Sequence, residues 1–420
     1  MQGPTSHRLA VLGGQPAFDA PYHVGSPNIG DRQRLLARIE GLLDNRRLTN
    51  RGPLVQEFEQ RVADIVGVRH CVAMCNGTVA LEIVTRALSM RDEVILPSLT
   101  FVATAHALQW QQITPVFGDC RPGTHHLDPA RIEALVTPRT TGVLPVNVWG
   151  RPCDIDGILS VAANRGLPVV FDSAHAFGCS YKGRMMGGFG NAEVFSFHAT
   201  KFINCFEGGA VVTNDDDLAQ AVRLMQNFGF SGRDQVTYVG TNGKMTEVEA
   251  AMGLTSLDAM DDFVERNRQN YQAYRAGLQA VPGIELVEYD ERERCNYQYV
   301  VAEVDERITG IGRDEILQAL AMENVDARRY FYPGCHRMEP YRSYFPNAGM
   351  LLGNTEDVLD RVITLPTGTA VSPDVAGVIA GLLGRIVEQG AAVKSVLQQA
   401  SGIRDDAHHR GLRKCANYRW

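Results

Sequence analysis

Lys201 is the residue of this sequence best placed for covalent chemistry. It ends the run Phe195-Ser-Phe-His-Ala-Thr-Lys201 and lies between strands expected at Glu193–Phe197 and Gly209–Thr213. An isolated lysine is usually a surface residue, because charged groups are rarely buried without partners. A lysine on the connection between two core strands lies instead at the floor of a cleft. There its amine can attack an aldehyde and form a Schiff base.

A candidate anion site follows the first expected strand, His70–Cys75. The run Asn76-Gly77-Thr78 opens a helix, and a helix N-terminus offers free backbone N–H groups and a favourable dipole to a phosphate. Taken alone, the motif is better explained as a plain turn with Thr78 as an N-cap.

Three more polar or aromatic positions lie near strand ends. Asp172 follows the apolar strand Leu167–Phe171, where its carboxylate can pair with a pyridinium nitrogen or simply cap the next helix. His175 can bond a phenolic oxygen or serve a structural role. Phe101 can stack on a flat ring or pack in the core. Ser196, close to the lysine, can add a hydroxyl group to a phosphate site.

Together these positions supply a phosphate anchor, a stacking face, a partner for a ring nitrogen and a nucleophilic amine. Each alone is weak, but all fall at or near strand ends. That set matches the contacts of pyridoxal 5'-phosphate (PLP), which uses a lysine amine and a carboxylate beside its ring nitrogen. The combination predicts a PLP site.

The elements that must position this site indicate an α/β fold. Short apolar strands alternate with amphipathic helices from about residue 70 to 215, which predicts a mostly parallel sheet covered on both faces. In open sheets of this kind ligands bind at the carboxyl ends of the strands. The other strands are expected at Glu93–Leu96, Thr114–Gly118 and Thr141–Val148.

The length of 420 residues predicts a large domain and a smaller one. We expect an N-terminal segment at 1–34, a large PLP-binding domain at 35–265, a small C-terminal α+β domain at 266–395 and a flexible tail at 396–420. A long helical stretch at 247–280 would join the two domains. In the small domain we expect strands near 284–287 and 297–304 and helices near 313–323 and 374–388.

Composition excludes several classes of function. The net charge of −7 gives no general attraction to nucleic acid or to anionic membranes. The nine cysteines lack the spacing of a zinc site, so we expect reduced thiols and no metal. No signal peptide is evident and no apolar run is long enough to span a bilayer. These features favour a cytoplasmic protein.

Several motifs resemble the PLP-dependent sugar aminotransferases of the DegT/DnrJ/EryC1/StrS family, and the resemblance runs from about Gly13 to Arg385. The motifs are Cys75-Asn-Gly-Thr78, Asp92-Glu-Val-Ile-Leu-Pro-Ser-Leu-Thr-Phe101, Trp149-Gly-Arg-Pro-Cys153, Phe171-Asp-Ser-Ala-His175 and Phe195-Ser-Phe-His-Ala-Thr-Lys201. Ser173 departs from the pattern, because the family usually has alanine there. The resemblance implies a fold type I transferase.

The resemblance also implies a role for each site residue. Lys201 would be the Schiff-base lysine and Asp172 the partner of the pyridinium nitrogen. The remaining cofactor contacts would be Phe101 on the ring, Gly77, Thr78 and Ser196 at the phosphate, His175 near the phenolic oxygen, and Asn242 reaching the phosphate from the other subunit. A homodimer with shared active sites follows. Tyr332 and His336 would contact the sugar nucleotide.

Within the family, stretches such as Gly240-Thr-Asn-Gly-Lys-Met245 and Tyr330-Phe-Tyr-Pro-Gly-Cys-His336 look closest to antibiotic-pathway enzymes. Those enzymes move an amino group from L-glutamate to C4 of dTDP-4-keto-6-deoxy-D-glucose. The products are 2-oxoglutarate and dTDP-4-amino-4,6-dideoxy-D-glucose, as in desosamine, calicheamicin or indolocarbazole pathways. Arg233, Lys244, Arg328 and Arg329 are candidate cations for the two phosphates.

Three alternatives stay open from sequence. One is a C3 sugar aminotransferase, and another is a PLP-dependent sugar dehydratase of the same fold. Dehydrating relatives carry a histidine where this chain has Lys201, so the lysine favours amination. The third is a non-catalytic PLP-fold regulator or partner, for which no added basic DNA-binding segment is seen.

Overall fold

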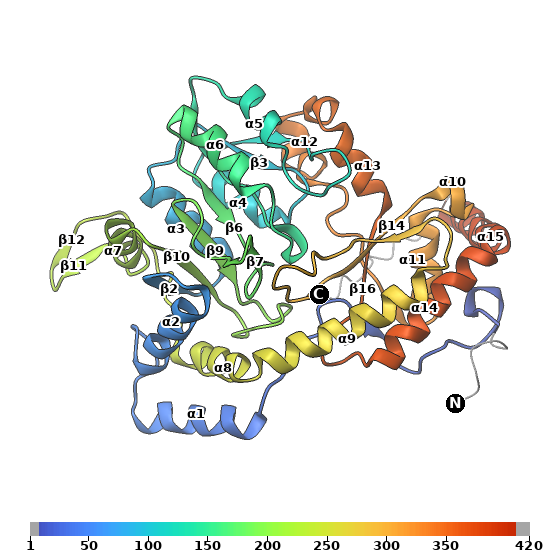
Figure 1. Cartoon of the computed structure of the whole chain (residues 1–420), viewed down its shortest axis with the longest axis horizontal. Coiled ribbons are helices and arrows are strands. Elements are labelled where there is room, and N and C mark those ends of the chain that lie inside the picture. The colour runs from blue at the N-terminus through green and yellow to red at the C-terminus, as the bar shows by residue number, and fades with distance from the viewer. Residues whose placement is uncertain (1–7, 409–420) are drawn as a thin grey trace.

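The chain is described here by a computed structural model, which covers the backbone of residues 8–408 and the side chains of residues 8–399. Figure 1 shows a larger body built around a twisted sheet and a smaller body beside it, with a long helix running between them. The division of the chain near residue 265 stays our proposal. It falls inside that long helix, α9 (Met260–Leu278).

The larger body contains one continuous sheet. Four strands are ordered β2–β10–β9–β6 and three are ordered β4–β3–β5, and parallel bridges Val143↔Val169 and Val146↔Asp172 join the two groups. The pairs β3–β4, β3–β5 and β6–β9 are parallel, whereas β10 is antiparallel to both neighbours. The expectation of a mostly parallel sheet is confirmed. The strands are β2 (His70–Met74), β3 (Glu93–Pro97), β4 (Thr114–Gly118), β5 (Thr140–Val143), β6 (Val170–Asp172), β9 (Ala192–Ser196) and β10 (Gly209–Thr213).

Buried apolar side chains on both faces explain why these strands form. One core cluster joins Phe58 of helix α2 (Pro53–Val66) to Phe171 and Phe195, and a second joins Val72, Val94 and Val194 on the opposite face. Strands buried on both faces are nearly continuous in apolar residues, as here. The helices that accompany the sheet are α1 (Arg32–Asp44), α2 (Pro53–Val66), α3 (Gly77–Ala87), α4 (Val102–Gln109), α5 (Pro129–Leu135), α6 (Ile155–Arg165) and α7 (Asp216–Met225).

The helical stretch expected at 247–280 is two helices. The first, α8 (Glu247–Asp258), begins with a capping box in which Thr246 and Glu249 satisfy each other's backbone N–H groups. It ends at Ala259, and α9 then continues to Leu278. The connection between the two bodies therefore bends at one residue.

The smaller body packs helices on a three-stranded antiparallel sheet. The sheet order is β13 (Ile284–Leu286), β14 (Val300–Val304) and β16 (Val362–Leu365). Leu9 and Val11, from the expected N-terminal segment, are buried in the core of this body. Its helices include α10 (Glu306–Thr309), α11 (Arg313–Met322) and α14 (Pro373–Glu388). The short helix α12 (Tyr341–Tyr344) packs instead on the larger body, where Tyr341 joins the core cluster of Val72, and α13 (Gly353–Arg361) follows it.

The tail expected from residue 396 does not begin as an irregular segment. Helix α15 (Gly390–His408) runs through its first part, and Val393 is buried in the small-body core. The rest of the expected tail, 409–420, lies outside the described residues. The short remaining strands are β1 (Tyr22–His23), β7 (Ser180–Tyr181), β8 (Arg184–Met185), β11 (Phe230–Gly232), β12 (Gln235–Val236) and β15 (Val325–Asp326).

In the described part of the chain, no single helix combines the length and apolarity needed to cross a membrane; only the bent pair of α14 and the start of α15 passes by length and composition together. Within residues 8–408, no group of three or more His, Cys, Asp or Glu side chains could hold a metal ion. Eight cysteines are described, and all are free thiols.

Candidate active site

Lys201 lies on the connection that follows β9, at the carboxyl end of the strand. Its Nζ is 3.3 Å from the hydroxyl oxygen of Tyr299, which comes from the smaller body. Burial lowers the pKa of the Lys201 amine to about 8, and the charge of Asp172 acts in the opposite direction. A lowered pKa leaves a useful fraction of the amine neutral, which a nucleophile or general base requires.

Asp172 ends β6, the parallel neighbour of β9, and is therefore at the same edge of the sheet as Lys201. Thr104 donates its hydroxyl to Asp172 Oδ2 at 2.8 Å, and the backbone N–H of Ala174 donates to Oδ1 at 3.1 Å. Burial raises the pKa of this carboxyl, while Thr104, Ala174 and Lys201 pull it down. A buried carboxylate in this position gains most from a cationic partner.

His175 is fixed through both of its ring nitrogens. The backbone N–H of Trp149 donates to Nδ1 at 3.2 Å, and Nε2 lies 3.1 Å from the hydroxyl of Tyr299. The ring is nearly parallel to those of Trp149 and Phe331, with centroids 6.2 and 5.8 Å away. Burial and the charge of Lys201 lower the pKa of His175 well below its usual value. A contact between His175 and the phenolic oxygen of the cofactor stays a prediction.

Phe101 is the N-cap residue of α4 and keeps its ring largely in the open, at 54% exposure. Its ring centroid lies 6.2 Å from that of Phe331, and its exposure places it outside the packed core. An exposed aromatic face beside a polar site suits stacking on a planar group. The core-packing alternative for Phe101 is thereby disfavoured.

The N-terminus of α3 and the end of β9 meet closely. Asn76, and not Thr78, is the N-cap: its Oδ1 accepts the N–H of Val79 at 2.8 Å. A Cβ atom on Gly77 would lie 3.2 Å from the Cβ of Ser196, so glycine is what permits this approach. The Ser196 hydroxyl and the first-turn N–H groups at Gly77 and Thr78 thus share one small region, as a phosphate site needs.

Asn242 is exposed and lies on the segment that follows the hairpin β11–β12. Its Oδ1 accepts a hydrogen bond from Lys244 Nζ at 2.6 Å. No contact in the described chain joins it to Lys201 or Asp172, and a contact with a second subunit stays a prediction.

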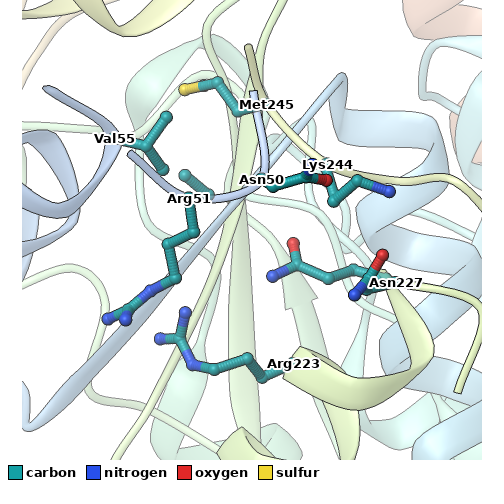
Figure 2. A pocket seen from close by; sticks show the side chains of 9 residues that line it. Asn50, Arg51, Val55, Arg223, Asn227, Lys244 and Met245 are labelled. Atoms are coloured by element: carbon teal, nitrogen blue, oxygen red, sulfur yellow. The ribbon is translucent and has the colours of Figure 1, made fainter. Parts of the chain in front are cut away.

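The inner side of this segment borders a pocket of about 120 Å³ lined by Asn50, Arg51, Val55, Ala73, Arg223, Gln226, Asn227, Lys244 and Met245. Figure 2 shows Arg51 and Arg223 pointing toward one another at one side, with the end of Lys244 turned away. Both arginines bond the carboxylate of Glu59. Their charge is therefore partly neutralised within the chain.

The two residues expected to contact a sugar nucleotide already have partners. The guanidinium groups of Arg313 and Arg329 lie over the ring of Tyr332, 4.8 and 4.2 Å from its centroid. His336 is buried, with Nδ1 2.6 Å from the Ser98 hydroxyl and Nε2 2.7 Å from Glu356. Substrate contacts by Tyr332 and His336 stay predictions.

Of the other candidate cations, Arg328 pairs with Asp326 at 3.3 Å and Arg329 with Asp314 at 2.9 Å. Arg233 has no role that the described contacts reveal.

The contacts of four residues at the site were not predicted from the sequence, although Trp149 and Phe331 lie in motifs that resemble the family. Thr104 bonds Asp172, Tyr299 bonds Lys201, and the rings of Trp149 and Phe331 stack 5.3 Å apart beside His175. Tyr299 and Phe331 come from the smaller body, far along the chain, so no spacing rule connects them to the strand ends. Thr104 lies three residues after Phe101, and that helical turn was the only available hint.

Comparisons with known proteins agree with this geometry. Residues 30–383 match the DegT/DnrJ/EryC1/StrS aminotransferase family. The chain is 34% identical to a dTDP-4-amino-4,6-dideoxy-D-glucose transaminase of Shigella dysenteriae over 360 residues, covering 85% of this chain and 97% of that one. An Escherichia coli protein of the same name is 32% identical over 369 residues, covering 87% and 98%.

Solved structures are similar as well. The crystal structure of DesI in the presence of its TDP-sugar product has a TM-score of 0.89 and 49% identity, covering 93% of this chain and 99% of DesI. DesV of S. venezuelae, in complex with a ketimine intermediate, has a TM-score of 0.79 and 30% identity, covering 85% and 95%.

Proposed function

Because the chain belongs to the DegT/DnrJ/EryC1/StrS aminotransferase family and is a PLP-dependent nucleotide-sugar aminotransferase, we propose that its acceptor is dTDP-4-keto-6-deoxy-D-glucose. In this proposal L-glutamate gives its amino group to C4 of the sugar. The products are dTDP-4-amino-4,6-dideoxy-D-glucose and 2-oxoglutarate, for the deoxyaminosugar of a natural product. The similarity to two dTDP-4-amino-4,6-dideoxy-D-glucose transaminases, which covers 85% and 87% of this chain, is the observation that carries the choice.

The residues present fit PLP. The first turn of α3 and the Ser196 hydroxyl would hold its phosphate, because glycine at position 77 lets the two come close together. Asp172, which has no cationic hydrogen-bond partner in the described chain, would pair with the ring nitrogen, and the exposed face of Phe101 would cover the ring. When bound, PLP supplies an electron sink for the carbanion left after α-proton removal.

Lys201 is the group that moves protons. Its amine, neutral in part at physiological pH, takes the α-proton of glutamate in the first half-reaction. In the second half-reaction it returns a proton to C4 of the sugar. The hydrogen bonds from Thr104 and Ala174 hold the Asp172 carboxylate in one position during both half-reactions.

We also propose a homodimer with shared active sites, in which Asn242 reaches the phosphate bound by the other subunit. Exposed apolar side chains on and around its segment support this, because Phe228, Phe230, Val236 and Val239 are 42–75% exposed. Apolar patches of this kind on a soluble enzyme often mark a protein interface. Sedimentation measurements that find only monomer would contradict the shared site.

The test is incubation of the PLP-loaded protein with dTDP-4-keto-6-deoxy-D-glucose and glutamate, followed by NMR of the sugar product. We expect an amine at C4 and one equivalent of 2-oxoglutarate. An amine found only when a 3-keto sugar is supplied would identify a C3 aminotransferase. Loss of a hydroxyl group without nitrogen transfer would identify a dehydratase, and no reaction with any keto sugar would favour the non-catalytic alternative.

A further inference from the structure

Asn28 joins three segments of the chain directly beside Lys201. The asparagine belongs to the N-terminal segment that precedes α1, yet it is only 3% exposed. Its Nδ2 donates at 3.1 Å to the backbone oxygen of Phe202, the residue that follows Lys201. Its Oδ1 accepts two hydrogen bonds from Thr369, one from the backbone N–H at 2.8 Å and one from the hydroxyl at 3.0 Å. One buried side chain thus connects the loop of the reactive amine to the smaller body.

The orientation of the Asn28 amide follows from its partners. The backbone N–H of Thr369 can only donate, so the atom that faces it is the amide oxygen. The backbone oxygen of Phe202 can only accept, so the atom that faces it is the amide nitrogen. Exchanging the two atoms would set donor against donor at one end and acceptor against acceptor at the other. The Asn28 side chain therefore has one favourable arrangement, in which it donates to Phe202.

The loop between β9 and β10, which carries Lys201, depends on such side chains. The N–H of Lys201 bonds the backbone oxygen of His198, but Phe202 has no backbone partner in the described chain. The N–H of Phe202 donates instead to Gln298 Oε1 at 3.3 Å, and its oxygen accepts from Asn28. Because Phe202 is only 3% exposed, these two groups depend on the side-chain amides rather than on water. Loss of either amide would leave a buried backbone group without a partner, which is costly.

The N-terminal segment also contacts the residue before Lys201. A Cβ atom on Gly25 would lie 3.1 Å from the side chain of Thr200, so glycine permits this approach. The segment is anchored at both ends. At one end β1 pairs with β15 of the smaller body, and at the other Arg38 of α1 bonds Asp258 of α8 in the larger one. It therefore contacts the residues on both sides of Lys201 from a fixed position.

We propose that Asn28 is a positioning residue for the reaction: its amide holds the residue that follows Lys201 and so fixes the place from which the amine acts. This rests on the assignment of Lys201 as the reactive amine in the proposed function. It goes beyond that assignment, because it gives the N-terminal segment a part in the reaction although no described contact joins Asn28 to the amine. A loosened loop would spread the amine over several positions, and small misplacements slow a reaction strongly.

Hydrogen exchange followed by peptide mass spectrometry tests the loop in the full-length chain without PLP. In the wild type we expect slow exchange of the amide protons in residues 198–206. In Asn28→Ala we expect about tenfold faster exchange of the same segment, because local opening becomes easier once the buried oxygen of Phe202 has lost its donor. Unchanged exchange in this variant would overturn the proposal.

Asn270→Ala is the matched control. Asn270 is fully buried, and its Nδ2 donates to three oxygen atoms between residues 367 and 371, the segment that contains Thr369. No described contact joins it to the Lys201 loop. The control should lose stability without faster exchange in residues 198–206. Equal acceleration in the two alanine variants would contradict a specific role for Asn28.

Thr369→Val supplies a milder variant in case Asn28→Ala does not fold. Thr369 is exposed, and the change removes only the hydroxyl that donates to Asn28 Oδ1. We expect exchange in residues 198–206 to become about threefold faster, because the Asn28 amide is then oriented by one donor instead of two. Exchange at the wild-type rate would contradict the role of Asn28 in holding the loop.

The glutamate half-reaction of the PLP-loaded protein tests the consequence for Lys201. Stopped-flow absorption of the cofactor gives a limiting rate and a half-saturating glutamate concentration. In Asn28→Ala we expect the limiting rate to fall about tenfold and the half-saturating concentration to change less than twofold, because the amine is misplaced while the contacts to glutamate are kept. In Asn270→Ala neither value should change more than about twofold.

An unchanged limiting rate in Asn28→Ala would overturn the positioning role. A wild type that does not react with glutamate would reject the proposed function instead. The exchange measurement needs neither cofactor nor substrate, so it would still decide whether Asn28 holds the loop.

Discussion

Two buried carboxyl groups on neighbouring strands, Asp172 on β6 and Glu193 on β9, serve opposite purposes. In the parallel register Phe171 pairs with Glu193 and Asp172 pairs with Val194. Because side chains alternate along a strand, the two carboxyl groups point to opposite faces of the sheet. Both are buried carboxyl groups of the same sheet. They differ in the groups that donate hydrogen bonds to them.

Glu193 accepts hydrogen bonds from three donors of its own chain. Oε1 accepts the N–H groups of Gly187 and Phe189 at 2.6 and 3.0 Å, and Oε2 accepts the hydroxyl of Ser173. Burial nevertheless raises its pKa to about 7. Asp172 has two donors and lies within the influence of Lys201. A buried carboxyl group held by two backbone N–H groups and a hydroxyl secures its own loop, whereas one with two donors at a strand end keeps more lone pairs free for a ligand.

Asp172→Asn should have the largest effect on activity. The amide keeps the size of the side chain but removes the charge that would pair with a protonated ring nitrogen. We expect the turnover rate to fall about 10³-fold, which corresponds to about 4 kcal/mol. Steady-state kinetics with glutamate and the keto sugar measure this. Glu193→Gln is the matched control and should change turnover less than about twofold, and equal losses in the two variants would erase the distinction between the carboxyl groups.

Glu193 should make stability depend on pH. Its folded pKa of about 7 is above the ordinary value of 4.5, so the folded state binds the proton more tightly. The resulting stabilisation is complete below pH 4.5 and is lost as pH rises through 7, a change of about 3 kcal/mol in the free energy of unfolding. Urea unfolding between pH 4.5 and 8.5 should show this fall in the wild type up to about pH 7, with no further contribution from Glu193 above it.

In Glu193→Gln the part of the slope due to this residue should be absent, because an amide does not titrate. Asp172→Asn is again the useful comparison. That variant leaves Glu193 in place, so the contribution of Glu193 to the slope near neutrality should persist. A wild-type slope retained in Glu193→Gln would show that another group causes it.

Thr104→Val should affect activity through Asp172. The variant keeps the shape of the side chain but removes the hydroxyl that donates to Oδ2 at 2.8 Å. A hydrogen bond to a charged group is worth about 2 kcal/mol, so we expect turnover to fall about 30-fold. Thr104→Ser, which restores the donor, should recover most of it. If the serine variant were as slow as the valine variant, packing and not hydrogen bonding would explain the loss.

The sequence predicts the part of the fold and site that depends on local pattern. The limits of β4 and β10 are as expected, and Asp172, Phe101 and Lys201 all lie near strand ends because strand ends follow from apolar runs. The contacts that Tyr299 and Phe331 make at the site could not be predicted, since they depend on how the smaller body packs against the larger. Trp149 lies in the larger body, and its stacking on Phe331 depends on the same packing. Glu193 was expected only as the first residue of a strand, although it is its second residue and wholly buried.

Substitution of Ser173 should have the smallest effect on activity and stability. It is also the most specific test, since the sequence pattern of the family usually has alanine there. Its hydroxyl donates to Glu193 and accepts from Asn147 Nδ2 at 2.9 Å, which accounts for the serine in this chain. Ser173→Ala should lower the free energy of unfolding by about 1 kcal/mol, and by more above pH 7 than below it, because the bond to an ionised carboxylate is the stronger one. Ser173 lowers the pKa of Glu193, so its removal should also shift the stability slope to higher pH. Turnover should stay within about twofold of the wild type, whereas a large loss would mean that the two faces of the sheet are coupled and that Glu193 acts on the site after all.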